Sequence, residues 1–100
     1  MKVKVTDLLL GYAGTPLKMQ DGDKVVDTTV RLALITALNT GVEGEKLSGE
    51  DKVQLYKLSI GITDADEVEL DAKQRTLILD RAEKIFNVIV YGRLRDLLNE

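Results

Sequence analysis

One stretch, Thr28 to Asn39, limits what this chain can fold into more than any other part. It reads TTVRLALITALN and is the densest apolar run with helical character. The apolar residues that share one face of the helical wheel are Val30, Ala33, Leu34, Ala37 and Leu38. Leu32 and Ile35 lie on the far side, and only Arg31 and Thr36 interrupt the wheel. A helix that is apolar nearly all round is normally buried on more than one side. We therefore expect the central core helix of a small domain.

The length of 100 residues predicts one domain over residues 1–100. The chain has no cysteine and no histidine, which excludes disulfides, thiolate metal sites and a histidine-dependent catalytic triad. No catalytic, cofactor-binding or metal-binding residue is assigned, and we expect no cofactor and no enzymatic activity. No segment has the roughly 20 apolar residues that a membrane span needs, and the N-terminus lacks the apolar core of a signal peptide. We expect a cytoplasmic protein without membrane contact.

The N-terminal part predicts β-structure. Its opening KVKV motif alternates charged and apolar side chains, the pattern of a half-buried strand. We expect a hairpin between about residues 2–11 and 16–20. The Asp21-Gly22 dipeptide predicts a tight turn, and residues 24–26 predict a third short strand.

The helix boundaries follow from capping residues. Asp27 or Thr28 is expected to cap the central helix, and Gly41 to end it in the left-handed conformation. Ser48, with Asp51 three residues later, predicts the start of a second helix over about residues 49–60.

The second half of the chain predicts two more helices. Asp71 and Gln74 form the capping pair of a third helix, and Gly61 is expected to close the second one. A fourth helix is expected over about residues 88–99, broken from the third near Asn87, although VIVY at residues 88–91 also fits a strand.

These elements predict an α+β fold. An N-terminal β-hairpin with short extra strands packs on about four α-helices, and the central helix lies between the hairpin and the C-terminal pair. Within the acidic segment 64–71, Val68 and Leu70 alternate with glutamates and predict a short edge strand that pairs with the N-terminal hairpin.

The acidic segment 64–71 is the first candidate for chemistry. A helix, an acidic loop and a helix suggest an EF-hand, but the spacing fails. Counting from Asp64 places Val68 at position 5, Glu69 at position 6 and Arg75 at position 12, where calcium loops need a ligand, a glycine and a glutamate. Nothing in the sequence marks the paired carboxylates as buried, so a carboxylate enzyme is a distant third hypothesis. We interpret the segment as a solvated loop whose acids favour the next helix.

The basic residues of the C-terminal half are the second candidate. They are Lys73, Arg75, Arg81, Lys84, Arg93 and Arg95. Acidic residues interleave with them, and the net charge is -3, so a nucleic-acid surface is the alternative and a solvated mixed-charge face the simpler interpretation.

Apolar residues occupy more than one side of the predicted helices. In the second helix, Val53, Tyr56 and Ile60 share a face, and Leu55, Leu58 and Ile62 form another apolar stripe. A domain this small does not readily bury every such stripe internally. An exposed apolar patch would mark an interface with a partner protein or with a second copy.

Five stretches carry a resemblance that covers nearly the whole chain: VKVTDLLLGYAGTPLKMQDGDKV, TTVRLALITALN, LSGEDKVQLYKLSIGI, EVELDAKQRTLILDRAEK and VYGRLRDLL. Their pattern of strands, caps and apolar spacing resembles small proteins of unassigned role from tailed bacteriophages and prophages. The resemblance implies a protein made in the cytoplasm of an infected or lysogenic bacterium, and it implies no chemistry.

The leading hypothesis is a non-enzymatic phage or prophage protein-interaction factor that presents a surface to a phage or host protein or to itself, as a homo-oligomer. The alternative is a small nucleic-acid-associated regulator that uses the basic residues of 73–95.

Overall fold

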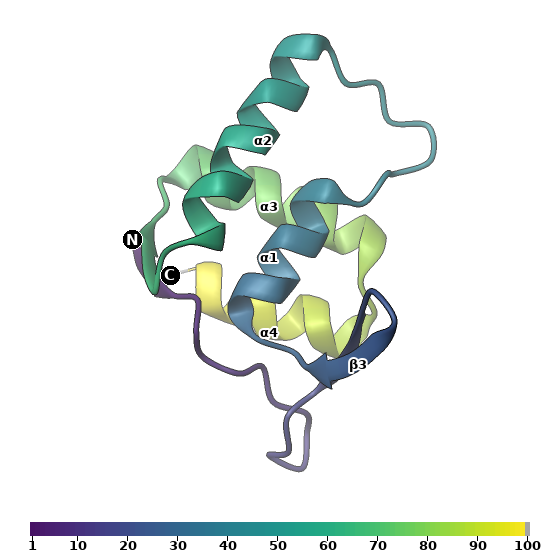
Figure 1. The fold of residues 1–100 in the computed structure, drawn as a ribbon, viewed down its shortest axis with the longest axis vertical. Helices are drawn as coiled ribbons and strands as arrows, with labels where there is room; N and C mark the ends of the chain where they lie inside the picture. Colours follow the sequence, from purple (N-terminus) through teal and green to yellow (C-terminus); the bar gives the residue numbers. More distant parts are fainter. Residues whose placement is uncertain (100) are drawn as a thin grey trace.

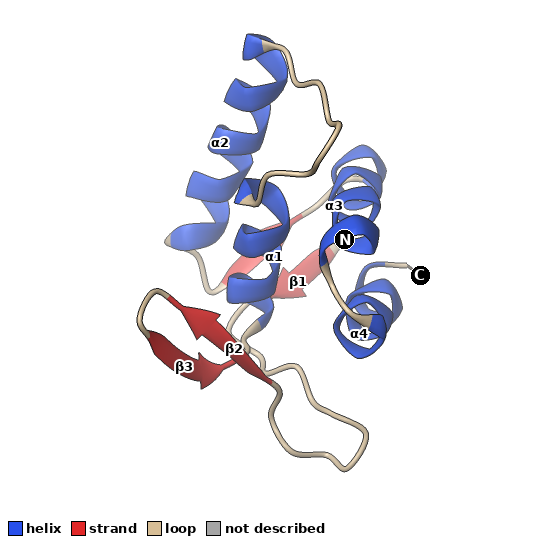
Figure 2. Ribbon diagram, turned by 90° about the vertical axis from the view of Figure 1, so that its right-hand side faces the viewer, coloured by secondary structure: helices blue, strands red, loops and turns tan. Residues whose placement is uncertain are grey.

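The computed structural model describes residues 1–99, which form an α+β fold of four helices and four short strands (Figures 1 and 2). In chain order the elements are β1 (Lys2–Lys4), β2 (Lys18–Asp21), β3 (Lys24–Asp27), α1 (Val30–Asn39), α2 (Gly49–Thr63), β4 (Glu67–Glu69), α3 (Ala72–Ile85) and α4 (Val88–Leu98). Helices α1 and α2 lie in one layer and α3 and α4 in a second (Figure 2). Over the described residues, no helix combines the length and apolarity that crossing a membrane requires.

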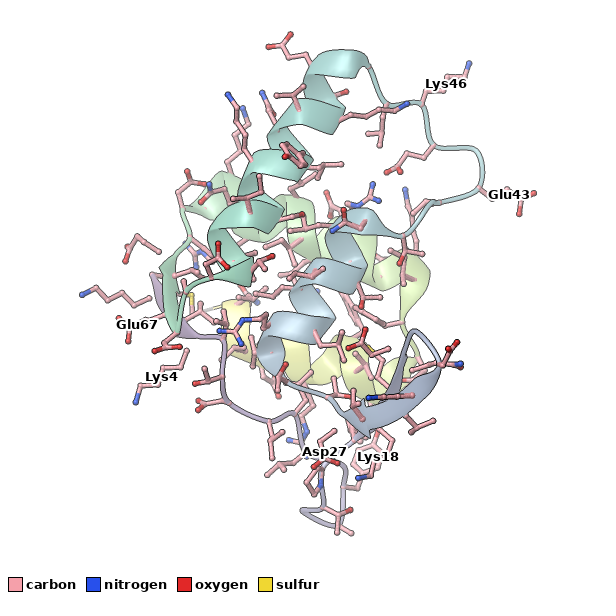
Figure 3. All side chains as sticks on the ribbon, viewed as in Figure 1. Lys4, Lys18, Asp27, Glu43, Lys46 and Glu67 are labelled. Atoms are coloured by element: carbon pink, nitrogen blue, oxygen red, sulfur yellow. The ribbon has the colours of Figure 1, made fainter. Side chains whose placement is uncertain are left out.

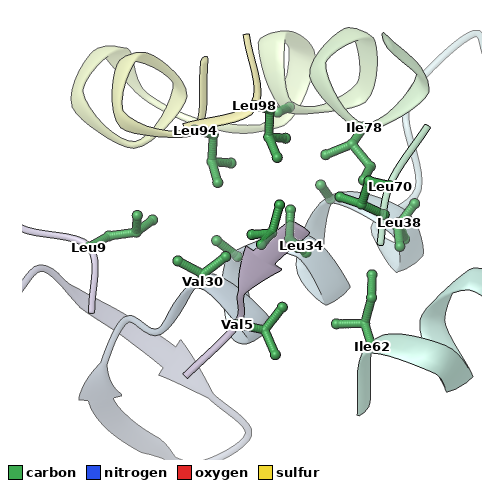
Figure 4. Close-up of a cluster of buried hydrophobic side chains, with 14 of the residues drawn as sticks. Val5, Leu9, Val30, Leu34, Leu38, Ile62, Leu70, Ile78, Leu94 and Leu98 are labelled. Carbon is green, nitrogen blue, oxygen red and sulfur yellow. The ribbon is translucent and has the colours of Figure 1, made fainter. Parts of the chain in front are cut away.

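Helix α1 lies at the centre of the core, as the sequence predicted. All five residues of its predicted inner face are buried: Val30, Ala33, Leu34, Ala37 and Leu38. Figure 4 shows Leu34 surrounded by side chains from the N-terminal segment and from the other helices. The outer residues Leu32 and Ile35 are half-buried. Helix α1 contacts α2 on one side and α3 on the other, which explains why it is apolar nearly all round.

The cap of α1 is Thr29, so the prediction of Asp27 or Thr28 was wrong by one or two residues. The main chain of Thr28 instead forms strand-like hydrogen bonds with the N-terminal segment. Its C=O accepts a 2.8 Å hydrogen bond from the N–H of Leu9, and its N–H donates a 2.7 Å bond to the C=O of Leu17. These two bonds hold Thr28 in extended backbone, and the helix begins only after Thr29.

The C-terminus of α1 also differs from the prediction. The capping residue is Thr40 in extended backbone (φ -76°, ψ 131°), and Gly41 does not adopt a positive φ. The guanidinium of Arg81 donates hydrogen bonds to the C=O groups of Ala37 and Thr40. Because a side chain from α3 satisfies these terminal carbonyls, the chain needs no left-handed glycine there.

The predicted hairpin between residues 2–11 and 16–20 forms only near its turn, and the pairing of its outer residues was wrong. Strand β1 pairs antiparallel with β4, and β2 pairs antiparallel with β3 across the Asp21-Gly22 turn, where Gly22 has a φ of +62°. The turn and the third strand were therefore predicted correctly, as was an edge strand near Val68 that pairs with the N-terminus. Of the expected hairpin, its inner end forms: Leu10 bridges Pro16, Leu17 N–H donates a 2.9 Å hydrogen bond to the C=O of Leu9, and Gly11 N–H donates a 2.8 Å bond to the C=O of Thr15.

The starts of the later helices match the sequence. Ser48 and Asp51 form the capping box of α2, and Asp71 and Gln74 form that of α3. Asn87 caps α4, so the break near this residue is confirmed.

The helix over residues 88–91 was predicted correctly, whereas the end of the second helix at Gly61 was predicted wrongly. Residues 88–91 are helical, because Val90, Leu94 and Leu98 are buried at helical spacing. Gly61 lies inside α2, which continues to Thr63. A glycine inside a helix costs only about 1 kcal/mol, and extending α2 places Ile62 in the core.

One buried hydroxyl gives a test of this core. Thr28 is fully buried, and within residues 1–99 its Oγ1 has no hydrogen-bond partner. Substituting Thr28→Val keeps the shape and removes the unpaired polar atom, so we expect the free energy of unfolding to rise by about 1 kcal/mol. Urea unfolding monitored by circular dichroism measures it. A loss of 1 kcal/mol or more would show that the hydroxyl is hydrogen-bonded.

Candidate protein-binding surface

Helix α2 exposes a line of apolar side chains to solvent. Val53 is 48% exposed, Tyr56 62% and Ile60 48%, and their spacing of three and four residues places them on one face. We name these three residues the α2 stripe. The opposite face of α2 packs on the core through Leu55 and Ile62. The sequence predicted both faces, and the structure shows that the stripe is the one left open.

The core-facing side of α2 is fixed to α1 by polar contacts. The side-chain amide of Asn39 donates a 3.1 Å hydrogen bond to the hydroxyl of Ser59, which itself donates to the C=O of Leu55. At the C-terminus of α2, the guanidinium of Arg31 donates to the C=O groups of Ile62 and Ala65. These contacts hold the stripe in place before any partner binds, which lowers the entropic cost of association.

Charged residues border the stripe. Helical geometry places Lys52 on one side of it and Glu50 and Lys57 on the other, and all three are exposed. In Figure 1 the upper part of α2 extends beyond the rest of the molecule, next to the connector of residues 40–48. An apolar line with charged borders on a projecting helix has the layout of a protein interface, with an apolar centre and a polar rim.

A second apolar patch lies in the loop after β1. Leu8 is 43% exposed, Leu10 40% and Tyr12 82%, beside a shallow depression of about 450 Å³. Arg93 of α4 fixes this loop by donating hydrogen bonds to the C=O groups of Leu10 (2.8 Å) and Gly11 (3.2 Å). Figure 1 shows the loop at the end of the molecule opposite the free end of α2, so the two patches are separate surfaces.

The basic residues of 73–95 do not form one surface. Arg81 is buried, Arg75 donates a 3.1 Å hydrogen bond to the C=O of Leu98, and Arg93 holds the loop described above. Half of the six positive side chains are thus used to bind main-chain carbonyls inside the molecule. This arrangement gives the nucleic-acid alternative no support.

The acidic segment has structural contacts along its length. Asp66 lies 3.9 Å from Arg31, and Asp71 caps α3. The N-terminal ammonium of Met1 donates a 2.8 Å hydrogen bond to Glu69, and this bond lowers the pKa of the Glu69 carboxyl. Within residues 1–99 no three acidic side chains gather in a group that could hold a metal ion. The segment therefore joins α2, β1 and α3.

The geometry assigns no reaction to these surfaces, and comparison with other proteins adds no assignment. No protein-family model matches the sequence, and no curated protein or solved structure is significantly similar to it.

Proposed function

We propose that the chain is a non-enzymatic protein-interaction factor of a tailed bacteriophage or prophage, which binds a partner protein through the α2 stripe. The observation that carries the proposal is the exposure of Val53, Tyr56 and Ile60 on one face of a helix whose other face is anchored in the core. Leaving three large apolar side chains in water is unfavourable unless a partner covers them. The phage origin rests on the sequence pattern.

Charge favours a different protein over a second copy as the partner. If two α2 helices packed parallel about a two-fold axis, one border of the stripe would face the opposite border of the other copy, as e and g positions do in parallel coiled coils. This would bring Lys52 of one copy near Lys57 of the other. If they packed antiparallel about Tyr56, Glu50 of one copy would lie near Asp64 of the other, and the two Lys57 side chains would lie near each other. Both arrangements bring like charges together, which is unfavourable.

The test is Tyr56→Asp, with Val88→Asp as the matched control. Both side chains are exposed, Val88 by 80% at the start of α4, so neither change should alter the free energy of unfolding by more than about 0.5 kcal/mol. Tagged protein is used to capture partners from lysogenic or infected cells, and the captured protein is purified for titration. We expect Tyr56→Asp to weaken its binding at least about 30-fold, as at an aromatic hot spot, and Val88→Asp to leave it unchanged.

Light scattering over a range of concentrations completes the test. We expect a monomer, as the like charges along α2 predict. A dimer that Tyr56→Asp dissociates would identify a second copy as the occupant of the stripe. A strict monomer that captures no partner, or a partner held equally well by Tyr56→Asp, would contradict the proposal.

A further inference from the structure

Strand β4 has one paired edge and one open edge. Leu70 N–H donates to the C=O of Met1, and Val5 N–H donates to the C=O of Asp66, which makes Val3 and Val68 the directly hydrogen-bonded pair between them. Hydrogen-bonded and non-bonded pairs alternate in antiparallel sheets. The main-chain groups of the two residues flanking Val68 therefore point away from β1.

Those two residues are Glu67 and Glu69. Within residues 1–99, no main-chain hydrogen bond outside the helices and strands involves the N–H or C=O groups of these two residues. A short row of donors and acceptors is thus available along the outer edge of β4, in the geometry that an added strand needs.

A groove runs along this open edge. It has a volume of about 630 Å³ and lies between α2 and α3. Leu58 and Gly61 of α2 form one wall, and Lys73 and Leu77 of α3 form the other. Every residue from 67 to 71 lines it. Because consecutive strand residues point to opposite faces, a groove lined by all of them follows the edge of the strand and not one of its faces.

The paired edge shows which side chains suit β4. There, Lys2 lies opposite Glu69, Val3 opposite Val68 and Lys4 opposite Glu67. Figure 3 shows Lys4 and Glu67 side by side at the surface. Opposite charges and paired apolar side chains across strands are each favourable. A strand added on the open edge would meet the same glutamate–valine–glutamate row from its other side.

From these features we infer that the open edge of β4 binds an extended segment of another protein with alternating basic and apolar residues, adding it to the β1–β4 sheet as a third strand. Its main chain bonds to Glu67 and Glu69. Its basic side chains lie beside these two carboxylates, and its apolar side chain lies beside Val68, towards Leu58 and Leu77 in the groove. This site adjoins the α2 stripe at Lys57 but differs from it, since Val53, Tyr56 and Ile60 do not line the groove.

The probe is the acetylated peptide Thr-Lys-Val-Lys-Val-Thr, titrated into ¹⁵N-labelled full-length protein. We expect saturable shifts of the Glu67 and Glu69 amides at up to about 1 mM peptide. The charge-reversed peptide Thr-Glu-Val-Glu-Val-Thr has the same backbone and is expected to bind at least about tenfold more weakly. Equal binding of the two peptides, or shifts centred on Val53 and Tyr56, would overturn the inference.

Two changes test the main-chain bonds. Glu67→Pro removes the N–H that points away from β1 and leaves the hydrogen bonds between β1 and β4 intact, so we expect the peptide to bind at least about tenfold more weakly. Glu67→Gln is the comparison, because it keeps this N–H and loses only the charge contact. If Glu67→Pro fails to fold, a peptide that is N-methylated at alternate residues is used instead. It lacks the peptide N–H groups that would donate to the main chain of β4, and we expect the same loss of binding.

Further outcomes separate this inference from the proposed function. Tyr56→Asp should leave the affinity for the peptide unchanged, whether or not the stripe binds a partner. No saturable shift with the wild-type protein, or full binding of both the proline variant and the methylated peptide, would mean that the glutamates only protect the edge from aggregation.

Discussion

Replacing Arg81 by alanine is expected to lower the free energy of unfolding by about 3–5 kcal/mol. The Arg81 side chain is 5% exposed. It donates 2.7 Å hydrogen bonds to the C=O groups of Ala37 and Thr40 and pairs with the carboxylate of Glu45. Truncation leaves two carbonyls and a partly buried carboxylate without their donor. Urea denaturation at neutral pH, followed by circular dichroism, measures the change.

Two further variants separate the roles of this side chain. Arg81→Lys keeps the charge but loses the planar fork, so one ammonium cannot replace all three contacts, and we expect a smaller loss of about 2 kcal/mol. Glu45→Gln removes only the ion pair at a carboxylate whose side chain is 20% exposed, and we expect about 1 kcal/mol. A loss below 1 kcal/mol for Arg81→Ala would show that the guanidinium does not hold α1 and α3 together.

Replacing Leu34 by alanine is expected to cost about 2–5 kcal/mol, because Leu34 is fully buried and its removal leaves a cavity at the centre of the core. Leu32→Ala is the matched control on the half-buried outer side of the same helix. The control loses the same atoms and should cost less, about 1 kcal/mol, because water already reaches that side. Equal losses in urea unfolding, or a loss under 1 kcal/mol for Leu34→Ala, would show that α1 is not the centre of the core.

Local signals in the sequence located the elements more fully than the pairing of the strands. Capping pairs such as Ser48 with Asp51 act within one turn, so the sequence alone showed where helices start. The KVK motif of β1 indicated a strand, and its partner residues lie between 63 (Lys4 to Glu67) and 67 (Lys2 to Glu69) positions later in an acidic segment. Among the nearer apolar residues 8–10, Leu9 instead turns into the core, while Leu8 and Leu10 stay exposed. Strand pairing depends on tertiary packing, which alternation along the chain does not encode.

The roles of the arginines were also missed. Arg81 was grouped with a basic surface, although it follows Ile78 at a spacing of three and precedes Ile85 at a spacing of four, on the apolar side of α3. A charged residue on an apolar face predicts a buried polar contact, and this signal was present in the sequence. The carbonyls that Arg81 would bind could not be predicted, because they depend on where α1 ends.

The candidate surface was only half predictable. The spacing of Val53, Tyr56 and Ile60 was clear, but α2 has a second apolar stripe through Leu55 and Ile62. The two stripes look alike in one dimension. The position of α1 decides which stripe packs on the core. Asn39 of α1 donates a hydrogen bond to Ser59, and this contact orients the Leu55 side of α2 towards the core.

The pairing of β1 with β4 has a consequence for the order of folding. A contact between residues far apart in the sequence forms slowly, because the chain between them loses conformational entropy before the contact contributes any stability. During synthesis, Val3 has no partner strand until Val68 has been made, so the first strand is produced early and placed late. The hairpin of β2 and β3 closes locally, and we expect it to form before the sheet that joins the N-terminus to the second half of the chain.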